Sequence, residues 1–252
     1  MIKNARYTLY YSPFACSLAV HAALEKIGEG FELEKIDVKK GQHQTERYLQ
    51  FNRHGKVPLL QDGKKLIDQG AGILLYLSEQ HPEAELMPAA ATAEWGKALS
   101  ELFYMSNTVH PAFSMAFNPD RFTTGDKTQV FDKTLSRLDV LLEEIDSKLT
   151  QQDFLNGNKP YVADYYLVAM LNWLRIFKKG LNSYPNLRRY KARMDQLPEV
   201  SRAVSKEIKD LGFVVASVFK LMSVKKRLSR KLKGKPSLKR HDEKQYRVGG
   251  VS

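Results

Sequence analysis

The one cysteine in this sequence, Cys16, is the residue whose type and position most directly suggest chemistry. It follows a β-rich run at 6–11 (RYTLYY) and a Ser-Pro turn, and it opens a predicted helix over 16–27. A thiol at the N-terminus of a helix lies in the positive end of the helix dipole, which lowers its pKa and favours the reactive thiolate. The alternative for a lone cysteine is a small, buried apolar residue. Because the sequence holds no second cysteine, an internal disulfide is excluded and any redox cycle needs an external thiol.

Two further turns expose backbone groups that could bind a ligand. Val57-Pro58 begins a predicted strand, and a proline there, cis in one interpretation, leaves the N–H and C=O of Val57 available to an extended peptide. The alternative is an ordinary edge-strand proline. Gln69-Gly70 opens the next predicted helix, whose first N–H groups can hold a carboxylate. Asp68 could equally be only the N-cap of that helix.

His110 is the remaining candidate for acid–base chemistry. It lies within a predicted helix, beside the apolar stripe, where a histidine on its own is more often part of the core. No two histidines have metal-ligand spacing, and no glycine-rich loop could cradle a phosphate. We therefore predict no metal site.

The elements that must position these residues follow from the hydrophobic pattern. The first 80 residues read β-α-β-α-β-β-α, and the chain beyond them shows only helical periodicity. A length of 252 residues, 43% of them hydrophobic and 27% charged, allows one or two domains with a real core. The same composition excludes a wholly disordered chain, a collagen-like fibre and a multi-span membrane protein. Strands are expected at 6–11, 31–38, 57–60 and 65–67, and helices at 16–27, 45–51, 71–80, 95–113, 131–149, 162–177, 187–194 and 199–208.

Five segments occur in a specific order and spacing: TLYYSPFACSLAVHAAL, GKVPLL, LIDQGAGILLYLSEQHPEAELMP, VHPAFSMAF and ADYYLVAMLNWL. Together they resemble the cytosolic glutathione transferases, and the bacterial beta class in particular. The resemblance covers the chain from Arg6 to Ile208. It implies an α/β thioredoxin-like N-terminal domain, an all-α C-terminal domain, and a homodimer with glutathione as co-substrate in the cleft between the domains. The expected limits are 1–82 for the first domain, 93–208 for the helical domain and 209–252 for an additional tail.

The resemblance also implies roles for individual residues. Cys16 and His110 match the beta-class residues that contact the glutathione sulfur, and Val57 matches the residue whose backbone pairs with the cysteinyl part. Gln69-Gly70 matches the pair that receives the γ-glutamyl end. The full set of implied glutathione-binding residues is Cys16, Lys39, Lys40, Lys56, Val57, Pro58, Gln69, Gly70, Asn107 and His110, with Lys39 or Lys40 holding the glycine carboxylate. Phe113, Phe117 and Trp173 are expected to line the side that takes the hydrophobic electrophile.

Some positions depart from the family pattern. Gln69 stands where the family has glutamate, so the hydrogen bond is kept and the charge is lost. A charged hydrogen bond contributes about 1.5–3 kcal/mol against about 1 kcal/mol for a neutral one, so glutathione affinity is expected to fall about tenfold. Phe103 replaces an asparagine, and Pro111 replaces a lysine. Tyr161 takes the usual Ser/Thr N-cap position, while Asp164 keeps the acidic partner of that capping box.

Three functions remain open on these residues. The first is conjugation of the glutathione thiolate to small hydrophobic electrophiles. The second is thiol transfer through a mixed disulfide between Cys16 and glutathione. The third is a non-catalytic binding module of the same fold, localised by the tail.

The tail carries almost all of the excess charge. The net charge of the chain is +12, and residues 211–252 hold twelve Lys or Arg and two acidic residues. An apolar stretch at 211–224 followed by a basic run is typical of attachment to an anionic membrane surface, here through 211–240. A helix packed on the body with a solvated basic end is the alternative, and nucleic-acid contact is unlikely because no aromatic platform accompanies the run. The low cysteine content and the lack of a signal peptide favour the cytoplasm, peripheral to the membrane if the tail binds it.

Overall fold

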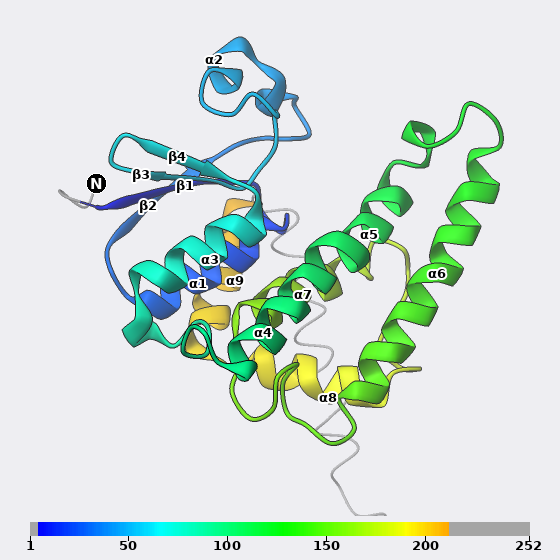
Figure 1. Ribbon diagram of the computed structural model, residues 1–252. Coiled ribbons are helices and arrows are strands. Elements are labelled where there is room, and N and C mark those ends of the chain that lie inside the picture. Colours follow the sequence, from blue (N-terminus) through cyan, green and yellow to red (C-terminus); the bar gives the residue numbers. More distant parts are fainter. Residues whose placement is uncertain (1–4, 212–252) are drawn as a thin grey trace, which may run out of the picture. The chain divides into compact units, whose positions relative to one another are not determined.

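Four strands form a sheet from the first part of the chain, and helices joined by loops make up most of the other residues described (Figure 1). The structure is a computed structural model that describes residues 5–211, so predictions for the tail beyond residue 211 lie outside it. The strands are β1 (Tyr7–Tyr11), β2 (Phe31–Lys35), β3 (Leu59–Asp62) and β4 (Lys65–Asp68). The helices are α1 (Ser17–Ile27), α2 (Glu46–Leu49), α3 (Gly70–Gln80), α4 (Ala93–Tyr104), α5 (His110–Phe117), α6 (Lys127–Lys148), α7 (Val162–Trp173), α8 (Pro185–Met194) and α9 (Pro198–Asp210).

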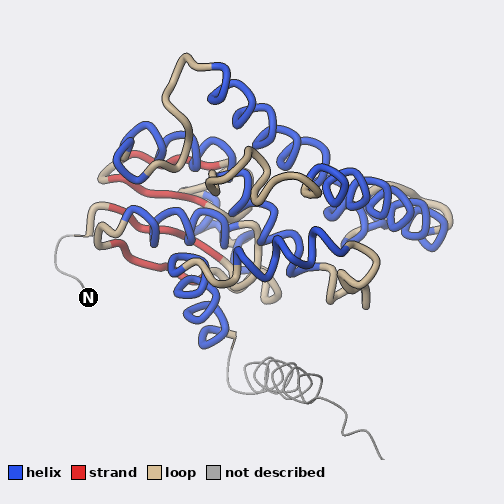
Figure 2. The backbone as a smooth tube through the Cα atoms, turned by 90° about the horizontal axis from the view of Figure 1, so that it is seen from below, coloured by secondary structure: helices blue, strands red, loops and turns tan. Residues whose placement is uncertain are grey.

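The sheet has the strand order β2-β1-β3-β4, with β1 and β2 parallel and the other pairs antiparallel. Alternation along β1 decides which helix covers which face. Tyr7, Leu9 and Tyr11 are buried on the face that α1 and α3 cover, whereas Tyr10 points to the other face and meets Tyr48 of α2. This arrangement is the thioredoxin-like fold that the sequence predicts. The helices that follow extend away from the strands, which gather at one end (Figure 2).

The third strand differs from the sequence prediction in its position. It begins at Leu59, which pairs with Tyr10, and it continues to Asp62. Val57-Pro58 precedes the strand and is joined by a cis peptide bond. A proline has no N–H to give to a strand ladder, so pairing starts only after it.

A π-helical turn at Met105–Val109 interrupts the single helix expected over 95–113 and separates α4 from α5. Pro111 lies in the first turn of α5, directly after it. A proline removes one helical hydrogen bond and crowds the preceding turn, and a wider turn accommodates both effects. His110 is therefore the first residue of a new helical segment and does not lie within a regular one.

The central helix α7 is buried along almost its whole length, as its uninterrupted apolar character predicts. Asp164 in its first turn is fully buried and accepts hydrogen bonds from Tyr161 N (2.8 Å), Leu155 N (2.9 Å) and the Tyr190 hydroxyl (3.0 Å). Burial raises the pKa of this carboxyl to about 6. The acidic half of the capping box is present, and Tyr161 adds no side-chain cap. Helix α7 ends at Trp173, earlier than predicted, because the chain continues in tighter turns such as Ile176 N to Trp173 O (2.9 Å).

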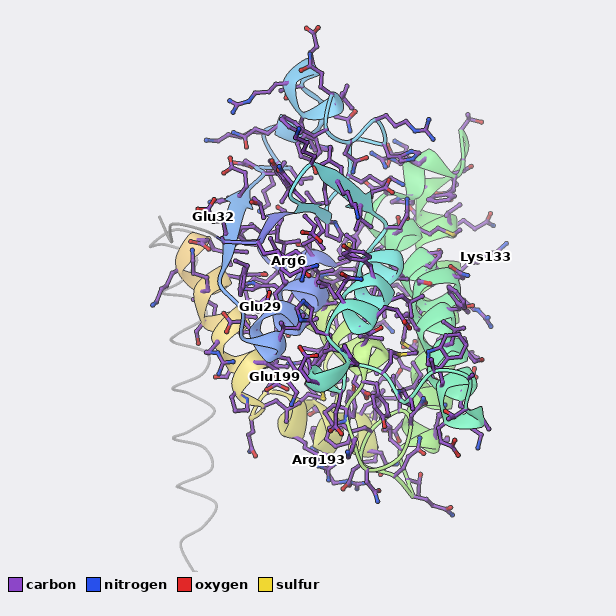
Figure 3. All side chains as sticks on the ribbon, turned by 60° about the vertical axis from the view of Figure 1, so that its left-hand side comes forward. Arg6, Glu29, Glu32, Lys133, Arg193 and Glu199 are labelled. Atoms are coloured by element: carbon purple, nitrogen blue, oxygen red, sulfur yellow. The ribbon has the colours of Figure 1, made fainter. Side chains whose placement is uncertain are left out.

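Helix α9 returns to the N-terminal sheet-and-helix unit and binds it through buried carboxylates. Glu207, which is fully buried, accepts from the backbone N–H of Phe14 (2.6 Å) and pairs with His21 of α1 (2.9 Å). Glu199 in the first turn of α9, labelled in Figure 3, accepts from the Tyr165 hydroxyl of α7 (2.9 Å). Asp210 at the end of α9 accepts from the Tyr11 hydroxyl of β1. One helix thus joins β1, α1 and α7.

We expect replacement of Glu207 by alanine to lower the free energy of unfolding by roughly 3–5 kcal/mol, because it removes the buried carboxylate that the Phe14 N–H and the buried His21 ring contact. Urea denaturation followed by tryptophan fluorescence measures the change. Ser205→Ala, an exposed position on the same helix, is the control and should unfold close to the wild type. Equal midpoints for Glu207→Ala and the wild type would contradict the structural role of Glu207.

Candidate active site

Cys16 lies at the N-cap of α1, as predicted, and is partly buried. The loop before it turns sharply at Phe14, which has a positive φ of 59°. The Cys16 thiol donates to the carbonyl oxygen of Val57 at 3.5 Å, just before the cis proline. The start of α1 and the start of β3 therefore meet at the thiol.

The pKa of the Cys16 thiol is raised to about 11, opposite to the direction expected from its position at a helix start. Burial is the largest cause, because it disfavours the charged thiolate. The N–H groups of Cys16 and Ser17 and the ammonium of Lys56 lower the pKa, so the predicted effect of the helix start is present but smaller. Without a ligand the thiol is therefore protonated at neutral pH.

The backbone of Val57 is only in part available to a peptide ligand. Its carbonyl oxygen accepts from Cys16, whereas its N–H has no partner among residues 5–211. The expectation that both groups are unpaired is thus wrong for the carbonyl. The carbonyl of the preceding residue, Lys56, is fixed by the Tyr48 hydroxyl and by Asn52 Nδ2, both at 2.8 Å.

Gln69 and Gly70 form the start of α3, as predicted. Gln69 is its N-cap, has a positive φ of 63° and keeps its side chain exposed. Asp68 ends β4, so the alternative that Asp68 caps the helix is wrong. A Cβ at Gly70 would lie 3.2 Å from Cε2 of Tyr166, closer than ordinary contact, which explains why a glycine is accommodated here.

The two lysines predicted for a carboxylate are both exposed in the loop after β2. The ammonium of Lys40 lies 3.9 Å from Asp37 Oδ2, and no acidic partner is found for Lys39 in the described part of the chain. No hydrogen bond or ion pair in that part joins either lysine to Cys16, Val57 or Gln69. Both lysines therefore remain predictions for the cation that holds the glycine carboxylate.

His110 begins α5 and faces α7. Its Nδ1 lies 2.9 Å from the Tyr166 hydroxyl, and its ring lies 5.2 Å from that of Trp173. Burial, assisted by the positive charge of Lys56, lowers the pKa of His110 to about 4, so the imidazole is neutral at neutral pH. Asn107, also predicted, is exposed on the π-helical turn and accepts from Ser106 Oγ (3.0 Å).

Trp173, at the end of α7, connects that helix to the loop that precedes Cys16. Its Nε1–H donates to the carbonyl oxygen of Phe14 at 2.7 Å. Phe117 packs edge-on against it and is 36% exposed, which fits a wall that a ligand can touch. Phe113 is fully buried behind Trp173, so its predicted contact with a substrate is wrong and it supports the wall instead.

Three residues at or around the site were not identified from the sequence. Phe177 stacks on Phe117 with ring centroids 4.9 Å apart, and its spacing of four residues from Trp173 was a usable signal. Tyr166 belongs to a quoted segment, and a hydroxyl in a buried helix requires a partner. Glu207 had no such signal, because its partners are remote in sequence.

Within residues 5–211 no group of three or more His, Cys, Asp or Glu side chains is arranged to hold a metal ion. No helix in the same range has both the length and the apolar character to cross a bilayer.

Two family models match the chain. The glutathione S-transferase N-terminal domain matches residues 5–79, and the glutathione S-transferase C-terminal domain matches residues 104–198. Glutathione S-transferase GstA of Escherichia coli O157:H7 is 30% identical over 202 residues, which cover 79% of this chain and 98% of that protein.

Solved structures agree with these matches. A bacterial beta class glutathione S-transferase of Sphingomonas chungbukensis is 32% identical, with a TM-score of 0.71 over 79% of this chain and 98% of that one. A sphingomonad glutathione S-transferase complexed with glutathione is 33% identical, with a TM-score of 0.70 and the same coverage.

Alkylation of the single cysteine by iodoacetamide tests the electrostatics of the site. We expect the rate for the ligand-free protein to rise with a midpoint near pH 11, because burial raises the pKa of Cys16, and not near its ordinary value of 9.0. Lys56→Gln should slow alkylation at about pH 8–9, where the lysine ammonium is still charged and favours the thiolate. Lys64→Gln, an exposed lysine in the β3–β4 turn, is the matched control. A midpoint at or below 9.0 would show that the helix start outweighs burial.

Proposed function

We propose that this chain, which belongs to the glutathione S-transferase family, is a beta-class enzyme whose chemistry centres on Cys16. As a member of the family it is a glutathione transferase, with glutathione as its co-substrate. The cysteine at the start of α1 and the histidine at the start of α5 support the class. The likeness to a solved beta-class structure supports it as well.

The observation that carries the proposal is the contact between the Cys16 thiol and the Val57 carbonyl, 3.5 Å apart. The cysteinyl part of glutathione would pair with the backbone of Val57 and take over this carbonyl. Its sulfur would then lie beside Cys16. The γ-glutamyl end would extend to the start of α3 at Gln69-Gly70, and the glycine carboxylate would reach Lys39 or Lys40.

Conjugation requires the glutathione thiol to lose its proton, which passes to solvent water. The N–H groups at the start of α1 and the ammonium of Lys56 favour an anion at this place, because both lower the pKa of the Cys16 thiol. The resulting thiolate attacks the carbon of a small hydrophobic electrophile, which would lie against Phe117 and Trp173. The new S–C bond forms from the sulfur lone pair, and the leaving group departs with the electrons of the bond that breaks.

Thiol transfer is the second candidate, because Cys16 itself lies where the glutathione sulfur would bind. The Cys16 thiolate attacks one sulfur of a glutathione-containing disulfide and releases the other half as a thiolate. A second glutathione thiolate then attacks the mixed disulfide, restores Cys16 and leaves as oxidised glutathione. Burial of Cys16 works against this route in the ligand-free protein.

Cys16→Ala distinguishes the two routes. We expect conjugation by the variant to persist at a reduced rate, because the start of α1 and Lys56 remain. The mixed disulfide, detected by mass spectrometry after exposure to oxidised glutathione, should disappear, since the sequence holds no other cysteine.

Each outcome selects one function. Loss of both activities assigns an essential role to the thiol, and a wild type that forms no glutathione adduct on Cys16 after exposure to oxidised glutathione eliminates thiol transfer through this residue. A wild-type chain that binds glutathione calorimetrically, yet performs neither reaction, would instead be the non-catalytic binding module.

Position 69 holds glutamine where the family has glutamate, and we expect this difference to weaken glutathione binding measurably. Gln69→Glu restores a negative charge at the place proposed for the ligand's ammonium, so we expect glutathione to bind about tenfold more tightly. Calorimetric titration measures this affinity. Gln50→Glu adds the same charge at an exposed position after α2 and should leave binding unchanged. A tighter complex in both variants would assign the effect to net charge and not to a contact.

The homodimer, the cytoplasmic location and the membrane surface remain predictions. The homodimer rests on the family resemblance alone. The tail interpretation rests on the charge pattern of 211–240 alone.

A further inference from the structure

The hydroxyl of Tyr166 makes one polar contact that the chemistry above does not use. It lies 2.9 Å from Nδ1 of His110, the histidine proposed to face the glutathione sulfur. Tyr166 belongs to α7 and is only 3% exposed. The contact therefore joins the most buried helix of the fold to the first residue of α5.

The proton of this hydrogen bond can be placed. The Tyr166 hydroxyl has no other hydrogen-bond partner within residues 5–211. If it accepted a proton from Nδ1, its own O–H would be buried without an acceptor, which costs about 1–3 kcal/mol. The hydroxyl therefore donates and Nδ1 accepts. A neutral imidazole that accepts at Nδ1 carries its proton on Nε2.

The tyrosine is also held in place by packing. A Cβ built at Gly70 would lie 3.2 Å from Cε2 of Tyr166, 3.6 Å from its hydroxyl oxygen and 3.6 Å from Cγ of Pro58. The ring thus packs closely against the start of α3, and Pro58 lies beside the same glycine. This packing, together with burial of the side chain, keeps the Tyr166 ring in place next to His110.

The other ring nitrogen is available to a ligand. No residue in the range 5–211 forms a hydrogen bond with Nε2 of His110. Lys56 acts electrostatically on both His110 and the Cys16 thiol, so the imidazole belongs to the same electrostatic environment as the sulfur position.

We propose that Tyr166 is a positioning residue that fixes His110 in the Nε2–H tautomer, so that His110 meets the glutathione sulfur as a hydrogen-bond donor and not as a base. The inference rests on the proposed function for the identity of the sulfur ligand. The assignment of the tautomer rests on the geometry of Tyr166 alone. A donor at this place stabilises the thiolate once it has formed, whereas a base would remove its proton.

Nitrogen-15 NMR of the full chain, labelled in histidine, tests the tautomer directly. Long-range proton–nitrogen correlations distinguish the two neutral forms, and loss of one signal set in His110→Gln assigns the resonances among the six histidines. We expect Nε2–H in the wild type at neutral pH. In Tyr166→Phe, which lacks the donor, we expect a mixture of the two tautomers.

Tyr165→Phe is the matched control. Tyr165 is the adjacent residue of α7, equally buried, and its hydroxyl donates to Glu199 and not to His110. The control should leave the His110 tautomer unchanged. A wild type in the Nδ1–H form, or a Tyr166→Phe spectrum identical to that of the wild type, would overturn the inference. The wild-type spectrum alone decides the first point, even if Tyr166→Phe folds poorly.

Kinetics then separates positioning from a structural role. Loss of one neutral hydrogen bond should lower kcat of conjugation about three- to tenfold in Tyr166→Phe, with KM for glutathione almost unchanged. Tyr165→Phe should keep the wild-type kcat. An unchanged kcat in Tyr166→Phe with a shifted tautomer would show that His110 does not meet the sulfur. A wild type that fails to bind glutathione would overturn the proposed function itself, whatever the tautomer.

Discussion

The backbone of Phe14 is the constraint on which the rest of the site depends. Its N–H donates to the buried carboxylate of Glu207, and its carbonyl accepts from the indole of Trp173. Two helices of the C-terminal part therefore hold the backbone of one residue of the N-terminal part on both sides of its Cα. With φ at 59°, that residue turns the chain into the start of α1 and so determines where Cys16 lies.

Burial and backbone dipoles oppose one another at the thiol. The N–H groups at the start of α1 favour a thiolate, but removal of the sulfur from water has the larger effect. The same burial keeps His110 neutral. Without a ligand, the Cys16 thiol is therefore protonated and the His110 imidazole is neutral at neutral pH. The exposed ammonium of Lys56 acts on both groups: it lowers the pKa of the thiol and that of the imidazole.

Features that depend on neighbouring residues were predictable from the sequence. The β-rich run at 6–11 predicted β1, and the turn before Cys16 predicted the start of α1. Contacts between distant residues were not predictable, because periodicity carries no information about them. Phe14 and Glu207 are 193 positions apart, and Tyr166 lies 56 positions from His110. The direction of the Cys16 pKa shift was mispredicted for the same reason, since it depends on burial by the complete fold.

The way in which Phe14 is held also bears on how such sequences can diverge. Glu207 and Trp173 bind the backbone N–H and carbonyl of residue 14. The two anchoring side chains are therefore constrained by hydrogen-bond chemistry, whereas position 14 is constrained by its backbone conformation and by the packing of its ring against the core. Over evolutionary time, other side chains of the loop before Cys16 can change while the Cys16 thiol keeps its position. The residues around the sulfur atom can thus diverge without a shift of the sulfur itself.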